Sequence, residues 1–250
     1  MKIIRSIKKF IYRFKLFFEE KKNKNNVYYL FDNHHSNKLI IIFSGMSGTY
    51  NYRKTLKKVP YDQLYIKDTW ANGVSYYLYE GGNNNPEIYT SRLIDEIISN
   101  KKYDEIICIG SSKGGASSLY FGLKHSADVI YSGVGQYRLG DYLGIYHAKK
   151  RPNYLIDVSG DGNREEWINI LNNKMESMVE SRRNSNTLIY LMYSKLEHTY
   201  PEHTCYLIEK LNECNIRHID IEEYFTDHWA CGDFFKALLI RTFYPKNNNK

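Results

Sequence analysis

The chain has 250 residues, of which 42% are hydrophobic and 25% charged, and its formal net charge is +7. This composition is that of a globular protein, and it excludes a collagen-like or disordered chain. The four cysteines form no C-x-x-C pair, which argues against a disulfide scaffold and a zinc ribbon. Continuous apolar runs, such as residues 39–43, are far shorter than the roughly 20 residues that span a bilayer, so an integral membrane protein is not expected.

The net charge is concentrated at the start of the chain. Residues 1–25 hold nine basic and two acidic side chains, whereas the remaining 225 residues hold 26 of each. The body of the protein is therefore neutral. The basic balance gives no support for a nucleic-acid partner.

Apolar side chains recur at helical spacing between the bases of residues 2–22, which predicts a basic amphipathic helix. A secretory signal is not expected, because a continuous apolar core and a small-residue cleavage site are both absent. One interpretation is a peripheral anchor on an anionic inner leaflet. The alternative is an ordinary helix packed on the domain. We divide the chain into residues 1–26, comprising this helix and a linker at 21–26, and a domain of residues 27–250.

Strand and helix patterns alternate along the domain. Apolar or alternating runs predict strands at residues 27–32, 38–44, 64–67, 75–79, 105–109, 129–132, 154–158, 187–193 and 217–221. Helical patterns lie at residues 87–99, 114–124, 138–148, 164–182, 201–214 and 234–243. This order predicts a single α/β domain with one doubly wound, mostly parallel sheet.

The sharpest motif is Gly110-Ser111-Ser112-Lys113-Gly114, which has the form G-x-S-x-G. A buried strand pattern precedes it and a helix pattern follows it, as in a nucleophile elbow. Glycines permit the close backbone approach of such a turn, and the helix N-terminus stabilises a developing oxyanion. We therefore predict that Ser112 is a nucleophile. The alternative is a glycine-rich turn that binds a phosphate or only packs, although no phosphate-loop motif G-x-x-x-x-G-K-[ST] occurs.

A nucleophilic serine needs a base, and the base needs an orienting acid. His228 follows the last predicted strand, where the base is expected in the chain order Ser, acid, His. Glu197 lies in the loop after the strand at 187–193 and is the preferred acid. Glu202 begins the next helix, where the dipole favours an acid for structural reasons. Asp227 is adjacent to His228, and adjacent side chains usually point apart, but it stays a rival.

Further site residues follow from the same layout. The backbone N–H of Lys113 is one expected oxyanion donor, and that of Gly45 or Met46, after the strand at 38–44, is the other. Tyr52 and Arg53 follow and are expected to line the substrate entrance, with an ordinary surface segment as the alternative. Histidines near Glu197 and Glu202 lack metal-ligand spacing, so neither a metal nor a cofactor is expected.

The elbow GSSKGG, the segment IIIFSGM…YNYRKTL and the late DHW pattern resemble the α/β-hydrolase superfamily. More narrowly, they resemble a bacterial capsular-polysaccharide biosynthesis group and the acetyltransferase component of the accessory Sec glycoprotein export system. The resemblance spans about residues 27–243 and implies Ser112 as nucleophile, His228 as base and Glu197 as acid. Many relatives have Asp at the acid position. The resemblance also implies a cytoplasmic, membrane-associated enzyme that acts on a surface glycan.

The sequence thus predicts a serine esterase or O-acyltransferase whose substrate is a glycan or an acyl ester. One alternative is a catalytically silent hydrolase fold that serves as an assembly protein in glycan export. Another is a glycosyl- or phosphotransferase, which usually carries a D-x-D metal motif that is missing here.

Overall fold

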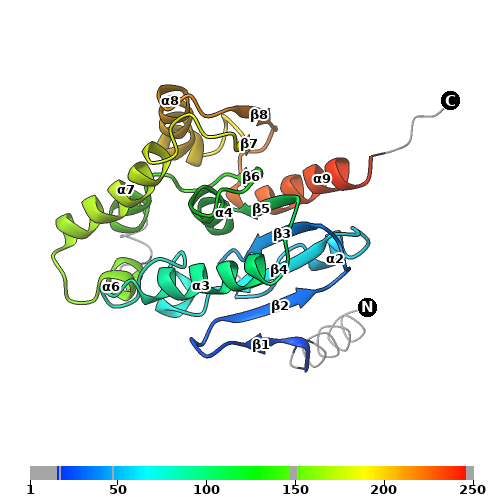
Figure 1. Cartoon of the computed structure of the whole chain (residues 1–250). Helices are drawn as coiled ribbons and strands as arrows, with labels where there is room; N and C mark the ends of the chain where they lie inside the picture. Colours follow the sequence, from blue (N-terminus) through cyan, green and yellow to red (C-terminus); the bar gives the residue numbers. More distant parts are fainter. Residues whose placement is uncertain (1–15, 17, 47, 147–150, 152, 246–250) are drawn as a thin grey trace, which may run out of the picture.

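The computed structural model describes residues 16, 18–46, 48–146, 151 and 153–245. Within them, eight strands form one sheet in the order β1-β2-β4-β3-β5-β6-β7-β8 (Figure 1). The strands from β3 onward are parallel, whereas β2 pairs antiparallel with β1 and β4. The predicted α/β class with a mostly parallel sheet is therefore confirmed. The strands are β1 (Lys21–Lys22), β2 (Tyr28–Asp32), β3 (Lys38–Phe43), β4 (Asp62–Lys67), β5 (Glu105–Ser111), β6 (Val129–Gly133), β7 (Leu188–Tyr193) and β8 (His218–Glu222).

Helices cover both faces of this sheet, and the strand side chains divide between two cores. In β3, Leu39, Ile41 and Phe43 enter one core, while Ile40 and Ile42 enter the other. Successive strand residues point to opposite faces of the sheet. A strand that is covered on both faces is therefore apolar at consecutive positions. One core contains residues of α3 (Asn85–Ser99), α4 (Lys113–Lys124), α5 (Leu139–Asp141), α6 (Asn153–Ser159), α7 (Arg164–Glu180) and α8 (Cys205–Glu213), and the other contains residues of α2 (Arg53–Leu56) and α9 (Cys231–Phe243).

Short helical turns complete the chain between these elements. They are the 3₁₀ turns η1 (Ala71–Gly73) and η4 (His228–Ala230) and the π turns η2 (Tyr142–Tyr146) and η3 (Tyr200–Thr204). No helix in the described ranges is both long enough and apolar enough to cross a membrane.

The strand predicted at residues 75–79 is wrong, because this segment forms turns. Tyr76 and Tyr77 have φ values of 54° and 60°, which lie outside the strand region. The Ser75 hydroxyl accepts the Tyr77 N–H at 2.8 Å and donates to Asp68 at 2.6 Å. Such side-chain bonds compete with a strand ladder for the backbone. The aromatic pattern suggested a strand, but it reflects the burial of these side chains in the core, since both tyrosines are at most 2% exposed.

The strand predicted at residues 154–158 is also wrong, because the segment belongs to α6. Leu155 and Val158 are buried in the core, three residues apart on one helix face, while Ile156 is 56% exposed. In so short a window, helical and strand periodicity give similar patterns.

The linker predicted at residues 21–26 forms part of a hairpin instead. Lys21 and Lys22 pair with Tyr29 and Tyr28. The Asn23 side chain accepts the N–H groups of residues 25 and 27, both at 3.0 Å, which fixes the turn. Most of the amphipathic helix predicted over residues 2–22 lies outside the described residues. The boundary at residue 26 stays a prediction.

A buried ion pair lies directly under the start of α4. The Lys113 ammonium contacts the Asp68 carboxylate at 2.8 Å, and the two side chains are 1% and 0% exposed. Lys113 also donates to the Gly73 carbonyl at 2.8 Å, and its ammonium lies 5.2 Å from the centre of the Tyr77 ring. Burial lowers the pKa of Lys113 below its usual value, although the Asp68 carboxylate opposes that effect. The pair ties the helix that follows Ser112 to the loop after β4.

We expect Asp68→Asn to lower the free energy of unfolding by about 3–5 kcal/mol, because it leaves the buried Lys113 charge without its partner. Lys113→Met leaves the Asp68 carboxylate buried without a cation and should also be strongly destabilising. The double variant removes both charges, and the amide introduced by Asp68→Asn can still accept from Ser75, so its loss should be smaller than the sum of the single losses. Urea unfolding followed by circular dichroism measures all three. If the losses in the free energy of unfolding were strictly additive, the proposed interaction between Asp68 and Lys113 would be contradicted.

Candidate active site

Ser112 occupies a sharp turn between the end of β5 and the start of α4. Its backbone has φ 53° and ψ −124°, a conformation that is strained for a serine. A Cβ at Gly110 would lie 2.1 Å from the Gly114 carbonyl oxygen, and one at Gly114 would lie 2.6 Å from the Phe43 carbonyl oxygen. Only glycine fits at both positions. The turn therefore has the form expected of the G-x-S-x-G motif.

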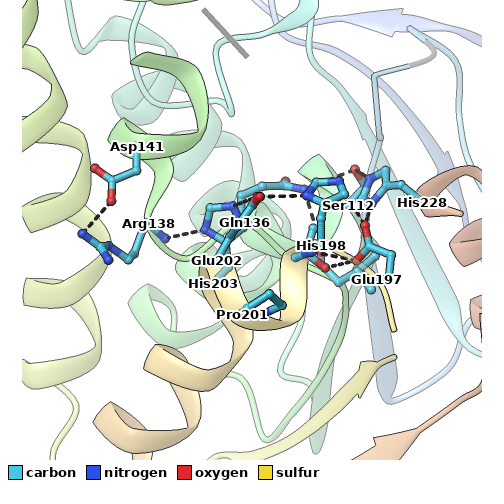
Figure 2. Close-up of polar contacts among 12 residues, drawn as sticks. Ser112, Gln136, Arg138, Asp141, Glu197, His198, Pro201, Glu202, His203 and His228 are labelled. Carbon is cyan, nitrogen blue, oxygen red and sulfur yellow. Dashed lines mark hydrogen bonds and ion pairs between the residues drawn. The ribbon is translucent and has the colours of Figure 1, made fainter. Parts of the chain in front are cut away.

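Three side chains from distant parts of the sequence form one hydrogen-bonded chain (Figure 2). The Ser112 Oγ lies 2.8 Å from the His228 Nε2, and the His228 Nδ1 lies 2.9 Å from the Glu197 Oε1. These residues follow the carboxyl ends of β5, β8 and β7, which are parallel and end at the same edge of the sheet. The structure thus brings together the serine, histidine and acid that the sequence singled out.

Glu197 is completely buried, and donors surround its carboxylate. Its Oε1 contacts the His228 Nδ1 and, at 3.0 Å, the His198 Nε2. Its Oε2 accepts the Thr199 N–H at 3.0 Å and a short hydrogen bond from the Thr199 hydroxyl. Burial works to raise the pKa of Glu197, but the bonds from His228 and Thr199 outweigh it and hold the pKa below its usual value. The carboxylate is therefore kept ionised and can only accept hydrogen bonds.

The two rival acids make other contacts. The Glu202 Oε2 lies 2.9 Å from the His198 Nδ1. The Asp227 carboxylate accepts the Trp229 N–H at 3.0 Å and so caps η4. Of the three candidate acids, Glu197 is the one whose carboxylate contacts His228 in the described part of the chain.

His198 bridges two carboxylates. Its Nε2 contacts Glu197 and its Nδ1 contacts Glu202, at 3.0 and 2.9 Å. A neutral imidazole has one N–H and one lone pair, so a neutral ring donates to one of the two carboxylates at a time. The ring also lies 5.4 Å from that of His228, centre to centre. His198 therefore holds one carboxylate oxygen of Glu197, while Thr199 holds the other.

The expected oxyanion donors lie close to the elbow. Lys113 is the first residue of α4, so its N–H has no partner within the helix. A Cβ on Gly45 would lie 3.8 Å from the Ser111 carbonyl oxygen, which places the loop after β3 beside the turn. Met46 is 37% exposed in the same loop. The roles of all three as donors stay predictions.

The two residues predicted to line the substrate entrance are held by other groups. The Tyr52 hydroxyl lies 2.5 Å from the Oγ of Ser111, the residue before Ser112. The Arg53 guanidinium contacts Asp32 at 2.9 Å and Glu19 at 2.6 Å. Tyr52 thus contacts the turn through Ser111, while Arg53 links α2 to β2 and to the N-terminal segment. Their role toward a substrate stays a prediction.

Sequence reasoning missed Gln136, which is fully buried beside the serine. Its Nε2 lies 3.5 Å from the Ser112 Oγ, and its Oε1 accepts from the Tyr76 hydroxyl at 3.2 Å. Gln136 follows β6, the neighbour of β5 in the sheet. A polar residue just past the carboxyl end of an adjacent strand was the available signal.

His203, in η3, is fully buried and packs against the rings of Tyr142 and Tyr146. Its Nδ1 accepts the Arg138 N–H at 3.2 Å, so the proton of the neutral ring lies on Nε2. That nitrogen has no hydrogen-bond partner among the described residues. Burial, with the nearby positive charges, lowers the pKa of His203 to about 3. The residue is therefore a neutral part of the site's wall.

Glu197, His198 and His228 also have the composition of a cation site. Each offers one ligand atom, and these atoms lie within 4.8 Å of one another. The Glu197 Oε1, however, already contacts both imidazoles, so a bound cation would replace those contacts.

Comparison with known proteins supports the fold assignment. No protein-family model and no curated protein matches the chain. A variant of the capsule O-acetyltransferase of Neisseria meningitidis serogroup A, solved with CoA, is 18% identical with a TM-score of 0.70, over 88% of this chain and 94% of that chain. A glycosylation-associated protein complex, Gap123, from Streptococcus agalactiae is 18% identical with a TM-score of 0.71, over 93% of this chain and 47% of that chain.

A third similar structure is FphF, a fluorophosphonate-binding serine hydrolase of Staphylococcus aureus. It is 11% identical with a TM-score of 0.56, over 88% of this chain and 94% of that chain. Identities this low establish a shared architecture rather than a shared activity. The chain therefore has the α/β-hydrolase fold, as the sequence motifs predicted.

The buried neutral His203 should make the protein sensitive to acid. Below about pH 6.5 the unfolded chain binds a proton on this ring, whereas the folded protein does not until about pH 3. The free energy of unfolding should therefore fall by about 1.4 kcal/mol for each pH unit in this window. We expect His203→Gln to flatten that slope in urea unfolding between about pH 6.5 and 4.5. The exposed His34→Gln is the matched control, and an equal slope in both variants would contradict the assignment.

Proposed function

We propose that this protein is a serine-dependent acyl-transfer enzyme. The observation that carries the proposal is the hydrogen-bonded chain from Ser112 through His228 to the buried carboxylate of Glu197. A serine at a strained turn, a base within hydrogen-bond reach and an acid that orients the base are the parts that nucleophilic acyl transfer needs.

In the proposed reaction the Ser112 hydroxyl attacks the acyl carbon and passes its proton to the His228 Nε2. The bond to the leaving group then breaks, and His228 returns the proton to the departing atom. Glu197 accepts from Nδ1 throughout, which fixes the tautomer and stabilises the imidazolium. The acyl-enzyme is discharged when a second hydroxyl, from water or a sugar, loses its proton to His228 and attacks the ester carbon. The bond from that carbon to the Ser112 Oγ then breaks, and His228 returns the proton to the serine oxygen.

The developing oxyanion is proposed to lie at the N-terminus of α4. The Lys113 N–H and the helix dipole favour negative charge there. Gly45 or Met46 is the proposed source of the second donor. Gln136 contacts the Ser112 Oγ from the side of β6 and is proposed to restrict the serine's rotamer.

The similar structures suggest which acyl donor and acceptor to test. One of them is a capsule O-acetyltransferase solved with CoA, so we propose an acyl thioester of CoA as donor. A hydroxyl of a capsular or surface polysaccharide is the proposed acceptor. Esterases share the fold as well, and a triad alone does not choose between water and a sugar.

A second candidate function is an assembly protein that has kept the fold without the chemistry. The similarity to the Gap123 complex favours this alternative. It predicts no reaction of Ser112 with acylating reagents, even though the side chains are in contact.

A peripheral membrane association through residues 2–22 is also proposed, from the basic amphipathic pattern. The described end of that segment is attached to the body. Glu19 contacts Arg53 at 2.6 Å, and Glu20 accepts the Tyr50 hydroxyl at 2.7 Å. The protein is proposed to act at the cytoplasmic face of the inner membrane, where capsule precursors would be accessible to it.

Ser112 should react covalently with a fluorophosphonate probe. We expect labelling of the wild-type protein, loss of labelling in Ser112→Ala, and a fall of about 10⁴- to 10⁶-fold in the rate of p-nitrophenyl acetate hydrolysis for His228→Gln. Ser111→Ala is the matched control, because it changes the adjacent serine and should keep the label. Absence of labelling in the wild type would favour the assembly protein. Thiol release from acetyl-CoA, with and without a capsular oligosaccharide, then separates transfer from hydrolysis.

Removal of residues 2–15 should weaken the binding of the protein to anionic vesicles, because it removes the basic amphipathic pattern. This truncation leaves Glu19 and Glu20 in place, so the contacts to Arg53 and Tyr50 and the fold should persist. Co-sedimentation with vesicles of phosphatidylcholine and phosphatidylglycerol measures the binding, and circular dichroism checks the fold. Unchanged sedimentation would show that the segment is not the anchor.

A further inference from the structure

Side chains of α2 and α9 and of the segments next to them line a basic groove. The two helices are in contact at one side of the sheet (Figure 1). Its volume is about 590 Å³, within the range of ligand sites. Five basic side chains line it, and the described residues of its wall include no Asp or Glu. These bases are Arg53, Lys54, Lys57, Lys58 and Lys236, and we call the site the α2–α9 groove.

Three of these charges are available to a ligand. Lys57, Lys58 and Lys236 are exposed and contact no carboxylate in the described parts of the chain. Arg53 differs, because it is only 17% exposed and is held by Asp32 and Glu19. Unpaired lysines that face one cavity repel one another, and a bound anion relieves that repulsion.

The groove also concentrates the charge of an otherwise balanced body. From residue 26 onward the chain has 26 basic and 26 acidic residues. With the five groove bases set aside, 21 bases remain against those 26 acids. The lining of the groove is therefore purely basic, whereas the rest of the body has an excess of acidic residues, a polarity that favours an anionic partner at the groove.

The shape of the groove is set by Tyr244, just after α9. Its hydroxyl donates to the Thr55 carbonyl at 2.9 Å and accepts the Lys58 N–H at 3.2 Å. The end of α9 is thus tied to the end of α2, so the lysines are presented by a preformed wall. Ile240, 42% exposed, adds an aliphatic side chain to the same lining. Lysine, tyrosine and an exposed aliphatic group together suit the boundary between lipid headgroups and acyl chains.

The N-terminal segment reaches the body at this same groove. Glu19 contacts Arg53 of the groove wall, and Glu20 accepts from Tyr50, which also lines it. Glu19 and Glu20 therefore attach the described end of the N-terminal segment at the groove. This continuity favours a membrane over a small soluble phosphate as the source of the anion.

We propose that the α2–α9 groove binds the phosphate headgroups of an anionic phospholipid bilayer and so makes a second membrane contact, in the folded domain itself. Lysine ammonium groups bind phosphate oxygens through charge-assisted hydrogen bonds. Each basic side chain near an anionic surface strengthens binding about fivefold. Loss of three groove lysines should therefore weaken binding about a hundredfold.

The test uses the full chain and vesicles of equal parts phosphatidylcholine and phosphatidylglycerol. The groove variant carries Lys57→Gln, Lys58→Gln and Lys236→Gln. The matched control carries Arg92→Gln, Lys102→Gln and Arg217→Gln, which remove the same charge from exposed positions outside the groove. We expect the groove variant to bind about a hundredfold more weakly than wild type and the control to bind within about threefold of it, with unchanged circular dichroism.

Equal weakening of both variants would overturn the proposal, since it would show a general effect of charge. Unchanged binding of the groove variant would overturn it as well.

A third arm adds inorganic phosphate without vesicles and follows thermal unfolding. Stabilisation by phosphate that the groove variant loses, together with no vesicle binding by wild type, would identify a soluble phosphate site in place of a membrane contact. Binding that persists after removal of residues 2–15 but is lost in the groove variant separates this proposal from the N-terminal anchor.

Discussion

The strained backbone of Ser112 is the constraint on which the site depends. Its positive φ persists because the turn is held from several sides: the Ser112 N–H donates to the Gly133 carbonyl at 2.8 Å, and glycines 110 and 114 admit neighbouring backbone at distances that no side chain would allow. The Asp68–Lys113 pair fixes the first turn of the helix beyond it. The surrounding fold thus stabilises a conformation that the serine alone would not adopt.

The sheet was predictable wherever burial dictated composition. The run at residues 38–44 is apolar because β3 is covered by helices on both faces, and the same holds for β5 and β7. Prediction failed where side chains bond to distant groups. Residues 75–79 read as a strand because of their tyrosines, but the bond from Ser75 to Asp68 turns the backbone, and no local pattern reveals a partner on another loop. The antiparallel pairing of β1 also depends on a neighbouring strand that composition does not specify.

The three residues predicted to act together lie in contact because motif and chain order carry most of that information. Ser112 is marked by its glycines, and His228 and Glu197 by the strands they follow. Gln136 and His198 escaped prediction for a different reason. The contacts of both side chains depend on how a loop orients them. Gln136 in particular reaches Ser112 only because β6 lies next to β5. The contacts that refine such a site are tertiary, so they become visible only when the loops are placed.

The chain of contacts from Ser112 to Glu197 draws on β5, β7 and β8, and its imidazole comes from the last stretch of sequence before α9. During synthesis the serine emerges from the ribosome long before the histidine that completes the group. A nascent chain therefore presents Ser112 without its imidazole partner until the C-terminal portion has been translated. Under the proposed function, a copy that ends before residue 228 lacks the base, so the acyl-transfer site is complete only after this late segment has been added.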